Sequence, residues 1–405
     1  MAVTTQPVLG AQAIRPFTVE TPQAQLDDLR SRILATRWPE RETVLDDTQG
    51  VQLALAQEIA RYWTSEYDWR RCEAKINGYP NFITEIDGLD IHFIHVRSRH
   101  EDALPVVICH GWPGSVIEQL KLIERLTDPT AHGASASDAF HVVIPSMPGH
   151  GFSGKPAEAG WGPERIGRAY VELMRRLGYD QFVAQGGDWG AIVVDLMAVP
   201  APPGLLGIHT NMAGVVPLDI FLATFAGNPV PDDLTAAEQR TVDQLRRFFS
   251  AHVAYGLIMG TRPQTLYGLA DSPIALAAFM LDHGDGSGQP GVVQRVLEGR
   301  QPDSDLTFDD FLDNVTHYWL TNTGVSSARL YWENKSAFFA VKGVTIPVAV
   351  SVFPDEIYTP PRSWAEKAYP NLIHFNELDR GGHFAAFEQP ELLSDEVRTA
   401  FRTLR

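Results

Sequence analysis

The sequence predicts an α/β protein in which a mostly parallel β-sheet is flanked by helices, and three observations support this class. Short continuous apolar runs recur after about residue 100, which is typical of parallel strands buried on both faces. Segments with helical apolar spacing separate several of these runs, as in strand–helix alternation. Residues 215–335 interrupt the alternation with a block of helical patterns.

The first 80 residues predict a helical arm. Apolar residues recur at helical spacing in residues 23–37 and continue similarly in residues 48–63. We expect this arm, residues 1–80, to lie against the larger part of the chain.

Residues 81–214 predict the first part of an α/β core. Residues 82–86 and 89–96 alternate apolar and polar side chains around Asp87-Gly88, which is a strong hairpin signal. The buried strands expected next are residues 104–109, 140–144, 181–184 and 205–208. The helices expected between them are residues 116–126, 165–177 and 191–197.

Residues 215–335 predict a helical lid inserted above the sheet. The helices expected within it are residues 236–254, 272–281 and 307–318. A glycine-rich loop, residues 283–291, lies between the last two. Residues 336–405 then predict the second part of the core. Its expected elements are strands at 346–353 and 372–375 and a helix at 390–404.

Composition narrows the class of function. The 405 residues are ample to bury a core, and a formal net charge of −17 makes a nucleic-acid partner unexpected, because such a surface repels phosphate. Cys72 and Cys109 are too few for a disulfide framework and lack zinc-site spacing. No apolar run approaches the roughly 18 residues of a membrane span, and the N-terminus does not resemble a signal peptide. We therefore expect a cytoplasmic protein without a membrane anchor.

The most informative motif is Gly186-Gly-Asp-Trp-Gly-Ala191, which follows an expected strand and precedes an expected helix. Small residues around one reactive residue at such a turn are what a nucleophile elbow requires, because larger neighbours would clash. The residue presented is Asp188, and an aspartate with a reference pKa of about 3.9 is ionised at neutral pH. It can therefore attack carbon without a base to activate it. From this turn alone, a capping role at the helix start also stays open.

A second loop, His110-Gly-Trp-Pro-Gly114, directly follows the apolar run that ends at Cys109. In folds with a nucleophile elbow, a loop at this position and the N–H after the nucleophile form an oxyanion hole. The candidate donors are the backbone N–H groups of Trp112 and Trp189. Alone, the loop predicts only a turn.

A histidine and two carboxylates complete a possible triad. His383 follows the last expected strand, which matches the chain order nucleophile, acid, histidine. The acid is expected after the preceding strand, where Asp355 and Glu356 follow Phe353-Pro354. On position alone, either carboxylate could orient the imidazole.

Two further sequence features argue against other functions. Residues 149–154 match the glycine pattern of a dinucleotide site, but Lys155-Pro156 and the residues after them do not open the helix that such a site needs. No Gly-x-Ser-x-Gly motif occurs, which argues against a serine esterase.

Together these motifs resemble the microsomal-type epoxide hydrolases of the α/β-hydrolase superfamily, over nearly the whole chain. The matching pieces are Thr36-Arg-Trp-Pro39, residues 110–115, 145–153, 186–191, 261–273 and 353–356, and residues 380–388. The resemblance implies an α/β-hydrolase fold with an inserted helical lid and an N-terminal helical arm.

The resemblance also implies roles for particular residues. Asp188 becomes the nucleophile, His383 the general base and Glu356 the charge-relay acid, with Asp355 as second choice. Two lid tyrosines, Tyr255 and Tyr331, would hydrogen-bond the epoxide oxygen. By itself each tyrosine would more often be a packing residue.

The implied activity is hydrolysis of a small apolar epoxide to a vicinal diol through a covalent aspartyl ester, with no cofactor and no metal. A homodimer is compatible with the resemblance. Two alternatives stay open: a dehalogenase with an aspartate nucleophile, and a non-catalytic ligand-binding protein of the same fold. Which epoxide is used, with what selectivity, and whether for detoxification or natural-product synthesis, does not follow from the sequence.

Overall fold

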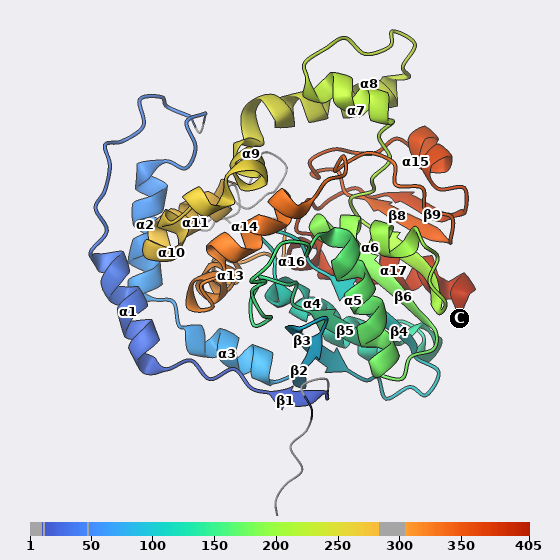
Figure 1. The fold of residues 1–405 in the computed structure, drawn as a ribbon, viewed down its shortest axis with the longest axis horizontal. Helices are drawn as coiled ribbons and strands as arrows, with labels where there is room; N and C mark the ends of the chain where they lie inside the picture. Colours follow the sequence, from blue (N-terminus) through green and yellow to red (C-terminus); the bar gives the residue numbers. More distant parts are fainter. Residues whose placement is uncertain (1–9, 11–12, 47, 283–303) are drawn as a thin grey trace, which may run out of the picture.

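The computed structural model describes residues 10, 13–46, 48–282 and 304–405, and the glycine-rich loop expected at residues 283–291 lies outside them. Within the described residues, the central sheet has nine strands in the order β1-β2-β3-β5-β4-β6-β7-β8-β9 (Figure 1). β1, β2, β3 and β5 pair antiparallel, and the pairs from β5 through β4 to β9 are parallel. The strands are β1 (Arg15–Phe17), β2 (Asn81–Ile86), β3 (Leu89–Val96), β4 (Leu104–Cys109), β5 (Phe140–Pro145), β6 (Phe182–Gly186), β7 (Leu205–Thr210), β8 (Val348–Val352) and β9 (Leu372–Glu377).

The parallel part of the sheet is covered on both faces, which confirms the α/β class. In β4, Val107 and Cys109 belong to one hydrophobic cluster together with residues of α5 and α6. Val106 and Ile108 belong to a second cluster with residues of α4 and α17. Because successive side chains of a strand point to opposite faces, β4 is apolar throughout. The helices of this core are α4 (Val116–Thr127), α5 (Pro163–Arg176), α6 (Trp189–Ala198), α15 (Arg362–Ala368), α16 (Ala385–Glu388) and α17 (Pro390–Phe401).

The hairpin predicted around Asp87-Gly88 is confirmed, since β2 and β3 pair antiparallel across it. Asp87 and Gly88 have φ angles of 52° and 78°. Positive φ at both central residues is the conformation that matches the twist of paired strands. The short strand β1 was not predicted, because three residues at a sheet edge give too little alternation to detect.

The N-terminal arm contains α1 (Gln23–Leu34), α2 (Leu53–Ser65) and α3 (Trp69–Asn77) besides β1. It contacts the helix α13 (Phe308–Leu320). The indole Nε1 of Trp63 donates a hydrogen bond to Thr316 Oγ1 at 3.0 Å, and the Tyr62 hydroxyl donates to Asp309 Oδ1 at 2.9 Å. The arm therefore lies against the helical segment between β7 and β8 as well as against the sheet edge (Figure 1).

The segment between β7 and β8, which we call the lid, is helical. Its described helices are α7 (Leu218–Phe225), α8 (Ala236–Arg247), α9 (Ala254–Thr261), α10 (Gly268–Asp271), α11 (Pro273–Leu281), α13 and α14 (Gly324–Glu333). The single helix expected at residues 236–254 was wrong, because a π-helical turn at Phe248–His252 separates α8 from α9. This turn redirects the chain just before Tyr255. The boundaries expected after residues 80, 214 and 335 stay predictions.

Within the described parts of the chain, no helix combines the length and apolar composition that crossing a membrane requires.

Candidate active site

Asp188 lies at a sharp turn between β6 and α6. Its φ of 50° and ψ of −128° are sparsely populated for a residue with a side chain, and such strain is typically held in place at functional sites. A Cβ atom at Gly186 would collide with the carbonyl oxygen of Gly190, and one at Gly190 with the carbonyl oxygen of Cys109. The flanking glycines therefore allow the turn to close, as the elbow motif predicts.

The loop after β4 holds the Asp188 carboxylate. The backbone N–H of Trp112 donates a hydrogen bond to Asp188 Oδ1 at 2.6 Å. Gly111 makes room for this contact, since a Cβ there would overlap the carboxylate. Trp189, the other predicted donor, is the first residue of α6, directly after Asp188.

His110 fixes the conformation of this loop, and sequence analysis assigned it no role. Its Nε2 accepts a hydrogen bond from the Met147 backbone N–H at 3.1 Å, so its Nδ1–H is left to donate to the Gly111 carbonyl at 2.9 Å. Burial lowers the pKa of His110 to about 4, which keeps the ring neutral and able to play both parts. The only available signal was its place at the end of a strand.

His383 lies between two carboxylates. Its Nδ1 is 2.5 Å from Glu356 Oε1, and its Nε2 is 3.5 Å from Asp188 Oδ2. His383 and Glu356 are buried, whereas the side chain of Asp355 is exposed, and its backbone pairs with the His383 loop through Gly381 and Gly382. Of the two carboxylates that the sequence left open, the structure brings Glu356 to the imidazole.

The charge of His383 depends on these neighbours. Burial by itself would lower the pKa of the imidazole, but the negative charges and hydrogen bonds of Glu356 and Asp188 raise it well above its usual value. The ring is therefore protonated at neutral pH.

The structure brings Tyr255 of α9 and Tyr331 of α14 together next to the elbow. Their rings lie 6.1 Å apart, Tyr255 stacks on Trp112 at 5.4 Å, and Tyr331 meets Trp189 edge-on at 4.7 Å. Burial is the largest of several causes, the Asp188 charge among them, that raise the pKa of both phenols well above 10. Both hydroxyls therefore keep their protons at neutral pH and can donate hydrogen bonds.

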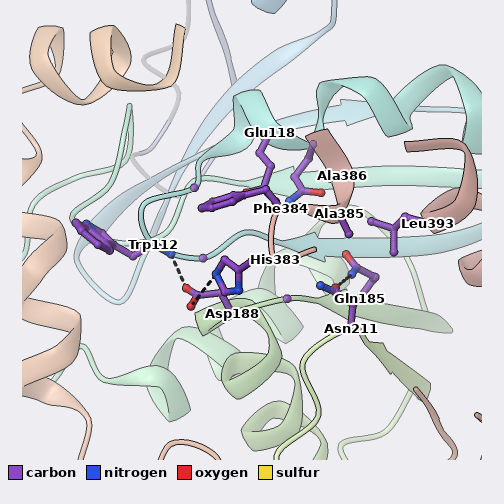
Figure 2. Close-up of a pocket in the computed structure, with 14 residues that line it drawn as sticks. Trp112, Glu118, Gln185, Asp188, Asn211, His383, Phe384, Ala385, Ala386 and Leu393 are labelled. Atoms are coloured by element: carbon purple, nitrogen blue, oxygen red, sulfur yellow. Dashed lines mark hydrogen bonds and ion pairs between the residues drawn. The ribbon is translucent and has the colours of Figure 1, made fainter. Parts of the chain in front are cut away.

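A small cavity of about 10 Å³ lies beside Asp188 and His383 (Figure 2). Its polar lining includes Glu118, Gln185 and Asn211, none of which sequence analysis singled out. Gln185 follows the apolar residues Phe182–Ala184 in the buried strand β6, which was the available signal for it. Asn211 directly follows β7 after His209 and Thr210, where one more polar residue gave no signal. Glu118 stands three positions after Ser115, where the sequence pattern is that of a helix cap.

The fold and this arrangement of side chains define the class of protein as an α/β hydrolase with an aspartate at the elbow. Two family models match the chain: one described as "Epoxide hydrolase N terminus" over residues 14–119, and one described as "alpha/beta hydrolase fold" over residues 105–251. The chain belongs to the epoxide hydrolase family, and it is an epoxide hydrolase.

Similar proteins extend along nearly the whole chain. A putative epoxide hydrolase of Stigmatella aurantiaca is 51% identical over 97% of this chain and 86% of its own length. Epoxide hydrolase 1 of Oryctolagus cuniculus is 37% identical, with 96% and 89% covered. The crystal structure of juvenile hormone epoxide hydrolase from Bombyx mori superposes with a TM-score of 0.83 at 29% identity, with 97% and 96% covered. All three similar proteins are described as epoxide hydrolases, so these findings support neither of the alternatives, a dehalogenase or a non-catalytic ligand-binding protein.

Proposed function

We propose that this epoxide hydrolase converts its substrate to a vicinal diol in two steps, through a covalent ester on Asp188. The observation that carries the proposal is the position of one carboxylate among three kinds of group. Asp188 accepts from the Trp112 N–H, lies beside the His383 imidazole, and interacts electrostatically with the two phenols of Tyr255 and Tyr331.

In the first step, one Asp188 oxygen attacks a ring carbon, and the bond between that carbon and the epoxide oxygen breaks. Negative charge develops on the leaving oxygen. Tyr255 and Tyr331 donate hydrogen bonds to it, and one of them supplies a proton, which it later regains from solvent. The product of this step is a hydroxyalkyl ester of Asp188.

In the second step, His383 removes a proton from water, and the water oxygen attacks the ester carbonyl. The Trp112 and Trp189 N–H groups stabilise the resulting oxyanion. The tetrahedral intermediate then collapses and the diol oxygen leaves with the proton held by His383. The new Asp188 carboxyl group gives its own proton to His383, which restores the carboxylate and the protonated imidazole. Glu356 keeps the imidazole oriented and stabilises its positive charge.

Ester formation prepares His383 for this second step. The Asp188 carboxylate is one of the two anions that raise the pKa of the imidazole. The ester is neutral, so this contribution disappears when the ester forms. The pKa of His383 then falls, and the ring can release its proton and act as a base.

The substrate proposed for this site is a small apolar epoxide. Aromatic rings surround the two phenols: Phe279 lies 5.8 Å from Trp112, and Phe338 lies 4.6 Å from Trp189. Such a lining favours an apolar ligand held by few polar groups.

Isotope labelling tests the ester mechanism. In H₂¹⁸O under single-turnover conditions, the label should enter the Asp188 carboxylate, because water attacks the ester carbonyl and not the substrate carbon. His383→Gln should still form the ester and accumulate it, as mass spectrometry of the intact protein would show. Label found only in the diol, or normal turnover by His383→Gln, would contradict the proposal.

A further inference from the structure

The cavity beside Asp188 has the size of one water molecule. Its volume of about 10 Å³ is close to the minimum that holds a single water. Asp188 and His383 line it together, so a molecule inside would touch both groups that the second step needs. In Figure 2, Glu118 reaches this space from above and Gln185 and Asn211 from below.

Glu118 is placed unusually for a residue of its kind. It stands three positions after Ser115, which caps the start of α4, and a serine followed by a glutamate at this spacing is the sequence pattern of a capping box. In the structure, the Ser115 side chain accepts a hydrogen bond from the Ile117 N–H. The Glu118 carboxylate instead lies against Gly114 and lines the cavity, so closely that a Cβ at Gly114 would overlap it.

Gln185 provides a second, independent observation. Its side-chain Nε2 donates to Asn211 Oδ1 at 3.0 Å, and its Oε1 is buried without a hydrogen-bond partner among the described residues. Only 2% of the residue is exposed. A buried carbonyl oxygen left unpaired costs free energy unless a water satisfies it, and this residue lines the same cavity as Glu118.

We propose that this cavity holds the water that hydrolyses the ester, and that Glu118 is a positioning residue that holds the water beside His383, with Gln185 as its opposite partner. The inference rests on the two-step function proposed above and deepens its second step. Neither Tyr255 nor Tyr331 lines this cavity, so a substrate held by the two lid phenols need not displace the water.

The charge state of Glu118 fits this role. Burial, together with the negative charges of Asp188, Glu388 and Glu356, raises its pKa to about 8, against the opposing effect of protonated His383. At neutral pH the group is therefore mostly a neutral acid, which can donate one hydrogen bond and accept another. Ionisation above that pH would place a second negative charge beside the site where an oxyanion must form.

Single-turnover kinetics test the role of Glu118. Glu118→Leu removes the proposed hydrogen bond to the water while keeping bulk, and should slow ester hydrolysis about 10- to 100-fold while leaving ester formation within about twofold. Glu118→Gln, which keeps a donor and an acceptor, should restore most of the hydrolysis rate. Glu124→Gln is the matched control, because it makes the same change on the exposed face of α4 and should alter neither step.

The pH dependence gives a readout that a purely structural role would not move. In the parent protein, the rate of ester hydrolysis should fall as rising pH ionises Glu118, whose pKa is raised to about 8 in the free protein. Glu118→Gln cannot ionise and should lack this fall. Because this variant is nearly isosteric, the test stands even if Glu118→Leu fails to fold.

Several outcomes would overturn the proposal: equal slowing of ester formation and hydrolysis in Glu118→Leu, unchanged hydrolysis in that variant, or an unchanged pH profile in Glu118→Gln. These outcomes differ from a failure of the proposed function itself. In that case the parent protein would form no ester, and His383→Gln would trap none.

Discussion

The Nδ1 atom of His383 lies 2.5 Å from Oε1 of Glu356, while the adjacent Asp355 carries an exposed side chain. Two carboxylates that are neighbours in sequence therefore occupy opposite environments. The buried Glu356 carboxyl group at this distance holds the imidazole in one orientation, with Nδ1–H toward Glu356 and Nε2 toward Asp188, so Nε2 is the atom that releases and takes up the proton.

This difference predicts unequal effects for two equivalent substitutions of a carboxylate by an amide. Glu356→Gln should slow ester hydrolysis by about 10²-fold, because a correctly held general base contributes about 10²- to 10⁴-fold. Asp355→Asn should change the rate by less than about twofold, as expected of a surface position. Rapid-quench measurement of ester decay checks both, and the reverse order of effects would identify Asp355 as the relay acid.

The tyrosine pair should act on the first step only. Tyr255→Phe and Tyr331→Phe should each slow ester formation by about 10²- to 10³-fold, the usual cost of one lost donor to a developing oxyanion. Decay of the ester, once formed, should be nearly unchanged.

The control for the tyrosine pair is Tyr170→Phe. This hydroxyl is also buried, lies on α5 and has no hydrogen-bond partner among the described residues. Its loss should leave ester formation unaffected. Stopped-flow tryptophan fluorescence can follow the step, since Trp112 and Trp189 contact the two phenols. Equal losses in all three variants would indicate a packing role.

The pKa of His383 should depend on the charge of Asp188. The pKa is raised in the free protein partly by that carboxylate, so a neutral replacement should lower it. Asp188→Asn imitates the neutral ester, and NMR titration of its His383 imidazole should give a lower pKa than in the parent protein. In the parent protein, the rate of ester hydrolysis should therefore rise with pH around the imidazole pKa of the ester form. That pKa should lie below the imidazole pKa of the free protein. An imidazole pKa that is equal in both proteins would contradict the link between ester formation and activation of the base.

Gly111 should tolerate no side chain. Gly111→Ala would push its Cβ into the Asp188 carboxylate and displace it from the Trp112 N–H, and a misplacement of about 1 Å can cost 10²-fold in rate. Gly268→Ala is the control, because nothing lies within 4 Å of the added Cβ in α10. Initial rates of diol formation and thermal melting of both variants check this. Full activity in Gly111→Ala would show that the carboxylate can move without loss.

The sequence predicted the strands and the elbow well because both depend on local patterns. Apolar runs such as that of β4 exist because both faces of one strand are covered, and Gly186 and Gly190 are needed by the turn in which they stand. The break between α8 and α9 was missed, because the apolar spacing through Phe248–His252 continues across the π-helical turn.

By itself, the sequence determined the α/β class, the elbow at Asp188, and His383 on a loop after the last strand. The resemblance to a family supplied the tyrosines and a preference between two carboxylates. Only the tertiary structure placed Glu356 and not Asp355 against the imidazole, set Tyr255 beside Tyr331, and turned Glu118 away from its helix cap into a water-sized cavity. The physical reason is that these contacts join residues far apart in the chain. In addition, a shift of one residue along a loop or helix changes which side chain is buried.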